Sequence, residues 1–261
     1  MKKNILIIGF GDLAERFERL VPNNSHTILG LTRSPNNHKG KNLTEWDWDK
    51  GQEFQLSTKH FDTVIFFPKP AEFSEEGYRS GFIESLKLIH KSLSAIEYKS
   101  FIAISSTRVY GASHNVLLSE SLIPEPSDYR GSIVLEYEAL VKSFFKDKSL
   151  ILRSSGLHTN SVKWMHDFID NFDGIKKQLP NFYLNRLHRN EFAKIISYAI
   201  ENDLYLHHAV INCSEGMISY KDIFKDEFDN LNFDDYFDCQ NKDKREVSNM
   251  KLKEVGFKFK S

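Results

Sequence analysis

Short apolar runs alternate with helical patterns along the first 157 residues of the chain. Runs rich in Val, Ile, Leu and Phe, typical of strands buried on both faces, cover residues 4–8, 26–31, 63–67, 101–105 and 149–153. Between them, apolar residues recur at helical spacing over residues 12–21, 72–96 and 128–145. This alternation predicts an α/β fold built on a Rossmann-type, doubly wound parallel sheet with helices on its faces.

The pattern changes after about residue 157. Helical patterns dominate there, over residues 162–172, 189–201 and 220–228, with one further strand near residues 209–213. We therefore predict a dinucleotide-binding domain over residues 1–157 and a small, mainly helical substrate lobe over residues 158–261. Because the strand near 209–213 fits the first sheet, we expect the two parts to be partly interleaved.

Composition narrows the function classes. The 261 residues carry 35 basic and 36 acidic side chains, so no overall field draws the chain to nucleic acid or to a membrane surface. No apolar run approaches the roughly 20 residues that span a bilayer, and the first run is too short for a signal peptide. We therefore expect a cytoplasmic protein with a small-molecule substrate. Neither Cys213 nor Cys239 has disulfide or zinc spacing, and no histidine pair has metal-ligand spacing, so we expect free thiols and no metal.

The sequence GFGDLA, which begins at Gly9, follows the first predicted strand and opens the first helix. It matches the pattern G-x-G-x-x-G/A of dinucleotide-binding turns. Gly9 permits the tight turn, Gly11 lets the backbone approach a diphosphate, and the small Ala14 lets helix and strand pack together. The helix start at Asp12 and Leu13 then offers N–H groups to the phosphates. We predict a bound nicotinamide cofactor here; the competing interpretation is a glycine-rich turn kept only for packing.

The end of the second predicted strand bears on the choice of cofactor. An NAD site normally has an acid about 20 residues past the first glycine, where this chain has Arg33 and Ser34. The planar fork of Arg33 suits a 2′-phosphate, and Ser34 adds a hydroxyl donor. We predict NADP, with NAD as the alternative; Arg33 as a solvated loop charge is the competing interpretation.

Other strand ends supply candidates at the same sheet edge, because ligands of doubly wound sheets bind at the carboxyl ends of the strands. Pro68 and Lys69 follow the strand at 63–67 and are expected to line the cofactor. Ser105 and Ser155 end two later strands, and we expect both near the cofactor. The competing interpretation is that these hydroxyls only bond turns of the backbone.

The segment SSTRVYG, which begins at Ser105, is followed by Glu120, a proline-containing stretch and Tyr129. In this order, with LTRSP, LRSSGL, NRLHRNEFAKII and KREVSN elsewhere, the chain resembles extended or atypical short-chain dehydrogenase/reductases of the NAD-dependent epimerase/dehydratase group. The likeness covers nearly the whole chain and is strongest to a branch of short bacterial sugar-epimerase-like proteins. It implies an NAD(P)-binding oxidoreductase or epimerase-like activity, in which Ser106 bonds the substrate oxygen and Tyr129 is the general acid/base.

The chain departs from that family at one position. The family has a lysine four residues after the tyrosine, and this chain has Ile133. Without the cation, a tyrosine is a poor general base at neutral pH. Three interpretations stay open: Lys69 or Arg108 replaces the lysine; Tyr129 works as a neutral acid in carbonyl reduction; or the chain is a non-catalytic NADP-binding sensor or interaction protein.

Three further expectations concern surfaces and single residues. The helices predicted at 72–96 and 128–145 are candidates for a homodimer seam, although a core needs their apolar faces as well. Trp164 is a candidate roof of a substrate pocket, against the simpler interpretation of a packing residue. We expect His188 to be structural, and Asn190 or Glu191 to cap or charge the helix that follows it.

Overall fold

The computed structural model describes residues 2–21, 25–38, 40–112, 115–159, 163–172, 178–228, 230–238 and 244–259. Cys239, one of the two predicted free thiols, lies outside these ranges. Cys213 is a buried, unpaired thiol on a strand of the central sheet.

Seven parallel strands of the described residues form the central sheet. They are β1 (Lys3–Ile8), β2 (His26–Thr32), β3 (Leu43–Glu45), β4 (His60–Phe66), β5 (Glu97–Ser106), β7 (Ser149–Ser154) and β11 (Val210–Cys213). The order across the sheet is β3-β2-β1-β4-β5-β7-β11. The direction of winding reverses between β1 and β4, the switch point at which doubly wound sheets bind their ligands. The predicted Rossmann-type α/β fold is confirmed.

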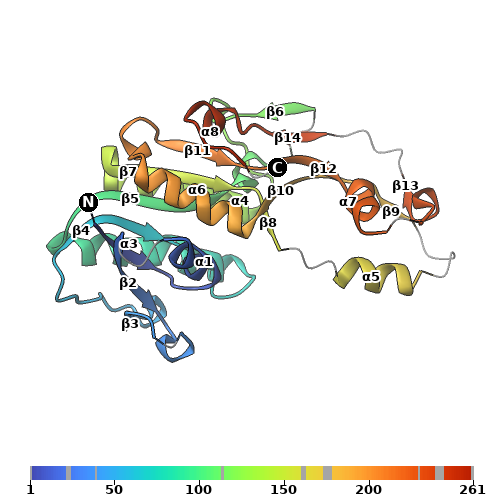
Figure 1. Cartoon of the computed structure of the whole chain (residues 1–261). Helices are drawn as coiled ribbons and strands as arrows, with labels where there is room; N and C mark the ends of the chain where they lie inside the picture. The colour runs from blue at the N-terminus through green and yellow to red at the C-terminus, as the bar shows by residue number, and fades with distance from the viewer. Residues whose placement is uncertain are drawn as a thin grey trace.

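Helices cover both faces of this sheet (Figure 1). One face carries α1 (Asp12–Leu20) and α6 (Arg189–Glu201), and the other carries α2 (Glu75–Arg79), α3 (Ser85–Ser92) and α4 (Tyr129–Phe145). A π-helical turn joins α2 to α3, so the pattern predicted over 72–96 is one interrupted helical segment. In β1, Ile5 and Ile7 face α1 and α6, whereas Leu6 and Ile8 face α3 and α4. Burial on both faces explains the continuous apolar run.

The rest of the described chain forms a smaller region of mixed structure. β8 (Gly156–His158), β10 (Tyr183–His188) and β12 (Gly216–Ser219) make a three-stranded sheet. Two short parallel pairs join β9 (Leu179–Pro180) to β13 (Phe237–Asp238) and β6 (Val116–Leu118) to β14 (Arg245–Val247). The helices of this region are α5 (Lys163–Asp170), α7 (Tyr220–Glu227) and α8 (Met250–Glu254).

This smaller region differs from the predicted lobe in that strands accompany its helices. The strand β10 was missed because it is only partly buried and its mixed polarity gives no strand pattern in the sequence. As expected from the strand near 209–213, residues after 157 return to the main sheet, where β11 pairs with β7 and α6 packs against α1. Figure 1 shows α5 and α7 at the end of the molecule remote from β4 and the chain's N-terminus.

Candidate cofactor and substrate site

The turn after β1 has a shape that only glycine allows at its first position. Gly9 has φ +87°, and a Cβ there would lie 2.5 Å from the carbonyl oxygen of Phe67. The N–H groups of Gly9 and Phe10 both donate to the Leu31 oxygen, at 3.0 and 2.9 Å. The Phe10 ring is buried against Gly30, where a Cβ would clash with it. The turn is therefore held to β2 and β4 and is not filled by its own aromatic side chain.

Open space lies in front of the helix that follows. Gly11 is the N-cap residue of α1 and has an extended conformation. Because glycine has no side chain, it donates or accepts no side-chain capping hydrogen bond at the helix start. A Cβ on Gly11 would meet nothing within 4 Å. The N–H groups of the first helical turn are thus free of a side-chain cap, which is the arrangement that binds diphosphates.

The two predicted residues at the helix start differ in what they offer. The Asp12 carboxylate accepts hydrogen bonds from Arg16 at 2.9 Å and from Arg189 at 3.0 Å. The bond from Arg16, then that from Arg189, holds the pKa of Asp12 below its usual value against the opposing effect of burial. Its charge is therefore balanced within the protein. Leu13 packs partly into the core beneath α6, so at both positions the backbone N–H is the group suited to phosphate.

Arg33 stands at the carboxyl end of β2 beside a short 3₁₀ turn. Its guanidinium lies 5.1 Å from the centroid of the Trp48 ring and donates to Asp49 at 3.3 Å. The N–H of Ser34 donates to the Thr32 hydroxyl at 3.4 Å. Arg33 is therefore oriented by stacking, and its one carboxylate partner is half-exposed and able to give way to a phosphate.

The loop after β4 is fixed close to the glycine turn. The N–H of Phe67 donates to the Ile8 oxygen at 2.9 Å, which places Pro68 and Lys69 next to β1. A Cβ on Gly81, in the π-helical turn, would lie 2.1 Å from the Lys69 oxygen, so the loop backbone rests directly on that turn. The Lys69 side chain itself is exposed.

A chain of polar contacts brings Ser106 and the start of α4 together. The Ser106 hydroxyl accepts a hydrogen bond from the Arg108 N–H at 3.2 Å, and the Arg108 guanidinium donates to Asp128 at 2.7 Å. Asp128 caps α4 by accepting from the Gly131 N–H at 2.8 Å. The helix begins one residue later, at Tyr129. Arg108 is thus engaged with the cap.

Tyr129 is 37% exposed, and its hydroxyl donates to the carbonyl oxygen of Phe73, in the loop after β4, at 3.2 Å. Ile133, at the position of the family's lysine, is 2% exposed and belongs to the core. The guanidinium of Arg130 lies 5.9 Å from the Tyr129 ring centroid and does not hydrogen-bond its hydroxyl. Among the described residues, no cation hydrogen-bonds the Tyr129 hydroxyl.

A buried polar network lies behind this strip, and the sequence analysis missed it. Glu138 on α4 accepts from Arg153 on β7 at 2.6 and 2.9 Å, and both side chains are at most 3% exposed. Arg153 also donates to the Tyr110 hydroxyl at 2.8 Å, which donates to Asn212 at 3.0 Å. Ser105 donates to Glu138 at 2.6 Å. The Ser105 side chain, predicted to contact the cofactor, therefore points into the core, because neighbouring residues of a strand face opposite sides.

Ser155 follows β7 and presents an unusual group. Its hydroxyl is buried and has no hydrogen-bond partner within the described ranges, although its N–H donates to the Cys213 oxygen at 2.9 Å. Buried hydroxyls are nearly always bonded. An unused hydroxyl at this strand end fits the predicted contact with a bound cofactor.

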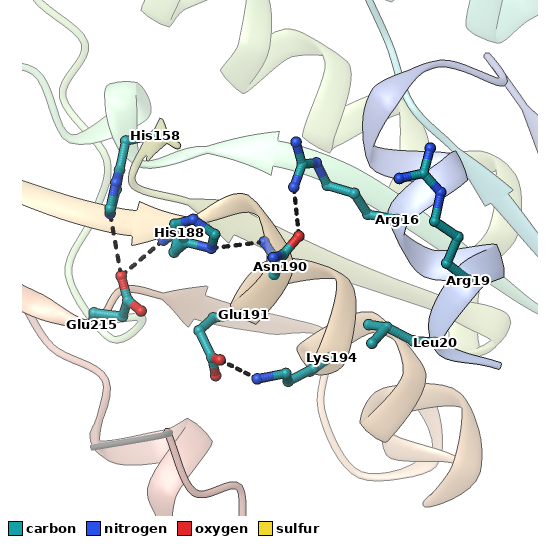
Figure 2. Close-up of a pocket in the computed structure, with 9 residues that line it drawn as sticks. All are labelled: Arg16, Arg19, Leu20, His158, His188, Asn190, Glu191, Lys194 and Glu215. Atoms are coloured by element: carbon teal, nitrogen blue, oxygen red, sulfur yellow. Dashed lines mark hydrogen bonds and ion pairs between the residues drawn. The ribbon is translucent and has the colours of Figure 1, made fainter. Parts of the chain in front are cut away.

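A hollow of about 730 Å³ lies along the flanks of α1 and α6 (Figure 2). Its cations already have partners: Arg16 bonds Asn190 at 2.5 Å, Arg19 bonds Glu15 on α1, and Lys194 pairs with Glu191. It therefore offers no unbalanced charge to a ligand, and it borders the side of α1 rather than its N-terminus.

Two histidines meet one carboxylate at the edge of this hollow, as Figure 2 shows. Glu215 accepts from the His188 backbone N–H at 2.8 Å and lies 3.5 Å from His158 Nε2. His188 caps α6 by accepting from the Asn190 N–H at 3.2 Å, so the cap is the histidine. Glu191 lies in the first turn of α6 and places an acidic charge at the helix start, as predicted. Burial, followed by the charge of Arg186, lowers the pKa of His158.

No helix within the described ranges has both the length and the apolar character needed to cross a bilayer. No group of three or more His, Cys, Asp or Glu side chains is gathered in this part of the chain in a way that could hold a metal ion.

The fold and the glycine turn together define a Rossmann-type α/β protein. Neither a family model nor a curated protein matches the chain by sequence. Several solved structures match it over more than nine tenths of their own length. A candidate NAD-dependent epimerase/dehydratase from Methylobacillus flagellatus is 20% identical with a TM-score of 0.72, covering 98% of this chain and 93% of that one. The chain thus has the fold of the NAD-dependent epimerase/dehydratases and related atypical reductases.

Two other similar structures contain ligands. UDP-N-acetylglucosamine 4-epimerase from Methanobrevibacter ruminantium M1, in complex with UDP-N-acetylmuramic acid, is 19% identical with a TM-score of 0.68 and covers 99% of this chain and 93% of that one. The human epimerase family protein SDR39U1 (isoform 2), with NADPH, is 15% identical with a TM-score of 0.59 and covers 81% and 74%. Further structures with this fold hold NAD.

Proposed function

We propose that this chain is an NADP-dependent oxidoreductase or epimerase-like enzyme that acts on a small carbonyl or sugar-like substrate. The observation that carries the proposal is the open space in front of Gly11, bordered by the uncapped first turn of α1. The N–H groups of Asp12 and Leu13 would hold the diphosphate there, and Arg33 would pair with the 2′-phosphate. A nicotinamide bound in this way supplies or accepts a hydride.

The polar strip at the end of β5 supports a role in reduction. The Ser106 hydroxyl accepts a hydrogen bond from the Arg108 N–H, which leaves its own proton available to polarise a substrate oxygen. Tyr129 is a hydrogen-bond donor in the structure, toward the Phe73 oxygen, so its phenol is set up to give a proton rather than to take one. A neutral acid suits the protonation of a reduced carbonyl and needs no adjacent lysine.

We expect Tyr129→Phe to reduce turnover about 100-fold or more while leaving NADPH binding unchanged, because it removes only the proton donor. The measurement is NADPH oxidation with a panel of small aldehydes and ketones, alongside NADPH titration followed by nicotinamide fluorescence. Tyr78→Phe, in the aromatic neighbour whose ring lies 5.8 Å away, is the matched control. Equal turnover in both variants would remove Tyr129 from the mechanism.

Arg33→Ala should weaken NADPH binding about tenfold or more and leave NADH binding nearly unchanged, because the 2′-phosphate loses a charged donor. The comparison is made by fluorescence titration of both cofactors. Arg19→Ala, which removes an exposed arginine from the far end of α1, is the control. If both cofactors weaken together, Arg33 does not select NADP.

One observation favours a second function, that of a non-catalytic NADP-binding sensor or interaction protein. Ile133 is buried where the family has its lysine. NADPH binding without turnover on any carbonyl compound would favour the sensor. The cytoplasmic location, the homodimer and the division near residue 157 stay predictions.

A further inference from the structure

A second cavity, of about 280 Å³, lies between β8, β10, α5 and α7. It starts directly after the buried hydroxyl of Ser155, because Gly156 and Leu157 of β8 form part of its wall. A ligand in this cavity would therefore adjoin the carboxyl end of β7.

The polar end of the cavity is formed by Arg186, whose positive charge is not paired with a carboxylate among the described residues. Arg186 on β10 lines the cavity and is partly buried. Within the described ranges, its guanidinium has no hydrogen bond and no carboxylate within 4.0 Å. Glu215 is the acidic group that acts on it, but that carboxylate is engaged by His188 and His158. Burial lowers the pKa of Arg186, which reflects the cost of holding this charge with little compensation.

The other end of the cavity is apolar and aromatic. Met165 and Ile223 are buried in its wall, and Tyr220 lies beside them. The Trp164 indole, 47% exposed, meets the Tyr220 ring at 5.7 Å between centroids. A half-exposed indole over an apolar wall is the kind of surface that a ligand covers.

We propose that this cavity binds a small organic acid with an apolar or aromatic body, whose carboxylate pairs with Arg186. A guanidinium fork matches a carboxylate with two parallel hydrogen bonds. The inference rests on the proposed function, since it specifies the substrate class of the same site. The volume is slightly below the roughly 300–1,000 Å³ of pockets for drug-sized ligands, which favours a compact acid over a nucleotide sugar.

A carboxylate fits better than a phosphate. Arg186 is the cation among the residues that line this cavity, and burial, followed by the charge of Arg186, lowers the pKa of the neighbouring His158 and so disfavours its charged form. A dianion would need further positive charge or a set of backbone N–H groups, whereas a single negative charge balances the single guanidinium.

The test is direct binding to the full chain, with and without NADPH. The probes are benzoate, phenylacetate and 3-phenylpropanoate, each beside its uncharged amide, and phenyl phosphate. Heats of binding and tryptophan fluorescence are measured. We expect at least one acid to bind, about tenfold or more tighter than its amide, with a fluorescence change that Trp164→Phe abolishes. The fluorescence assignment is possible because Trp46 and Trp48 are buried in the core.

Variants then separate the charge from the cavity. Arg186→Met should weaken the acid about tenfold or more and erase the preference over the amide, whereas Arg19→Met should change neither. Equal binding of acid and amide, tighter binding of phenyl phosphate, or an unchanged Arg186→Met would each overturn the proposal. The acid-to-amide comparison needs only the parent protein, so it holds even if a variant folds poorly. NADPH titration of the same samples tests the cofactor independently: NADPH binding without acid binding contradicts this inference alone.

Discussion

Arg153→Met lowers the free energy of unfolding by about 3–5 kcal/mol, because it leaves the Glu138 carboxylate buried without its cation. Arg153 and Glu138 are 3% and 1% exposed and share hydrogen bonds of 2.6 and 2.9 Å. Once Arg153 is gone, the Ser105 hydroxyl is the one hydrogen-bond partner left to this buried carboxylate within the described part of the chain. Urea denaturation followed by circular dichroism measures the loss.

The same helix offers a matched control. Glu136, two residues before Glu138, pairs with Arg79 at 2.9 Å, but both side chains are 43% exposed. Arg79→Met should therefore change stability little, because water replaces the lost partner. Pairing Arg153→Met with Glu138→Leu should restore part of the stability, since the charge is then removed together with its partner. Equal losses in Arg153→Met and Arg79→Met would show that burial does not set the energy of the Arg153–Glu138 pair.

The network also supports the arrangement of the strip formed by Ser106 and Tyr129. Glu138 ties α4 to β7, and Ser105 ties the same carboxylate to the end of β5. Ser106 and Tyr129 lie at the ends of these two elements. Their relative position therefore rests on a buried ion pair in the layer behind them as well as on the hydrogen bonds of Arg108 at the start of α4.

Most of the central sheet was predictable because its strands are buried on both faces and so read as continuous apolar runs. The edge strand β3 is not buried and was not predicted. β1, β4 and β7 were identified within three residues at each end. β10 was not predicted, because its partly buried residues mix polar and apolar side chains without a regular period. The helical pattern of α6 also begins directly after it. Its pairing with β12 and β8 joins segments far apart in sequence, and such contacts leave no local signal.

In the candidate site, too, the features with a local sequence signal were predictable, and those formed by residues far apart in sequence were not. The glycine turn was predictable, because a positive φ at Gly9 and a close backbone approach each restrict the residue type. The sequence did not show which of Ser105 and Ser106 faces the ligand edge. Alternation along a strand places the two side chains on opposite faces, but it does not say which of them points into the core. A charge within an apolar helix face, as at Glu138, was the one available signal of the buried network. The grouping of Arg186, His158 and Glu215 comes from three separate segments and appears only in the folded chain.

Gly11→Ala should reduce NADPH affinity about tenfold or more while changing stability by less than about 1 kcal/mol. Its backbone has φ −134°, which any residue adopts, and a methyl group there would meet no protein atom within 4 Å. The methyl group would instead occupy the space in which we place the diphosphate. Gly9→Ala is the counterpart, since its φ of +87° and the 2.5 Å approach to the Phe67 oxygen leave no room. That variant should lose roughly 1–3 kcal/mol of stability whether or not cofactor is present.

The pair of variants separates a binding turn from a packing turn. A turn kept only for packing would tolerate Gly11→Ala in both assays, because nothing in the protein touches the new methyl group. A turn that holds a diphosphate would show normal unfolding of the cofactor-free Gly11→Ala variant, together with loss of the increase in melting temperature that NADPH gives the parent. If Gly11→Ala binds NADPH as the parent does, the space in front of α1 is not the cofactor site, and the enzyme and the sensor are both excluded as we have described them.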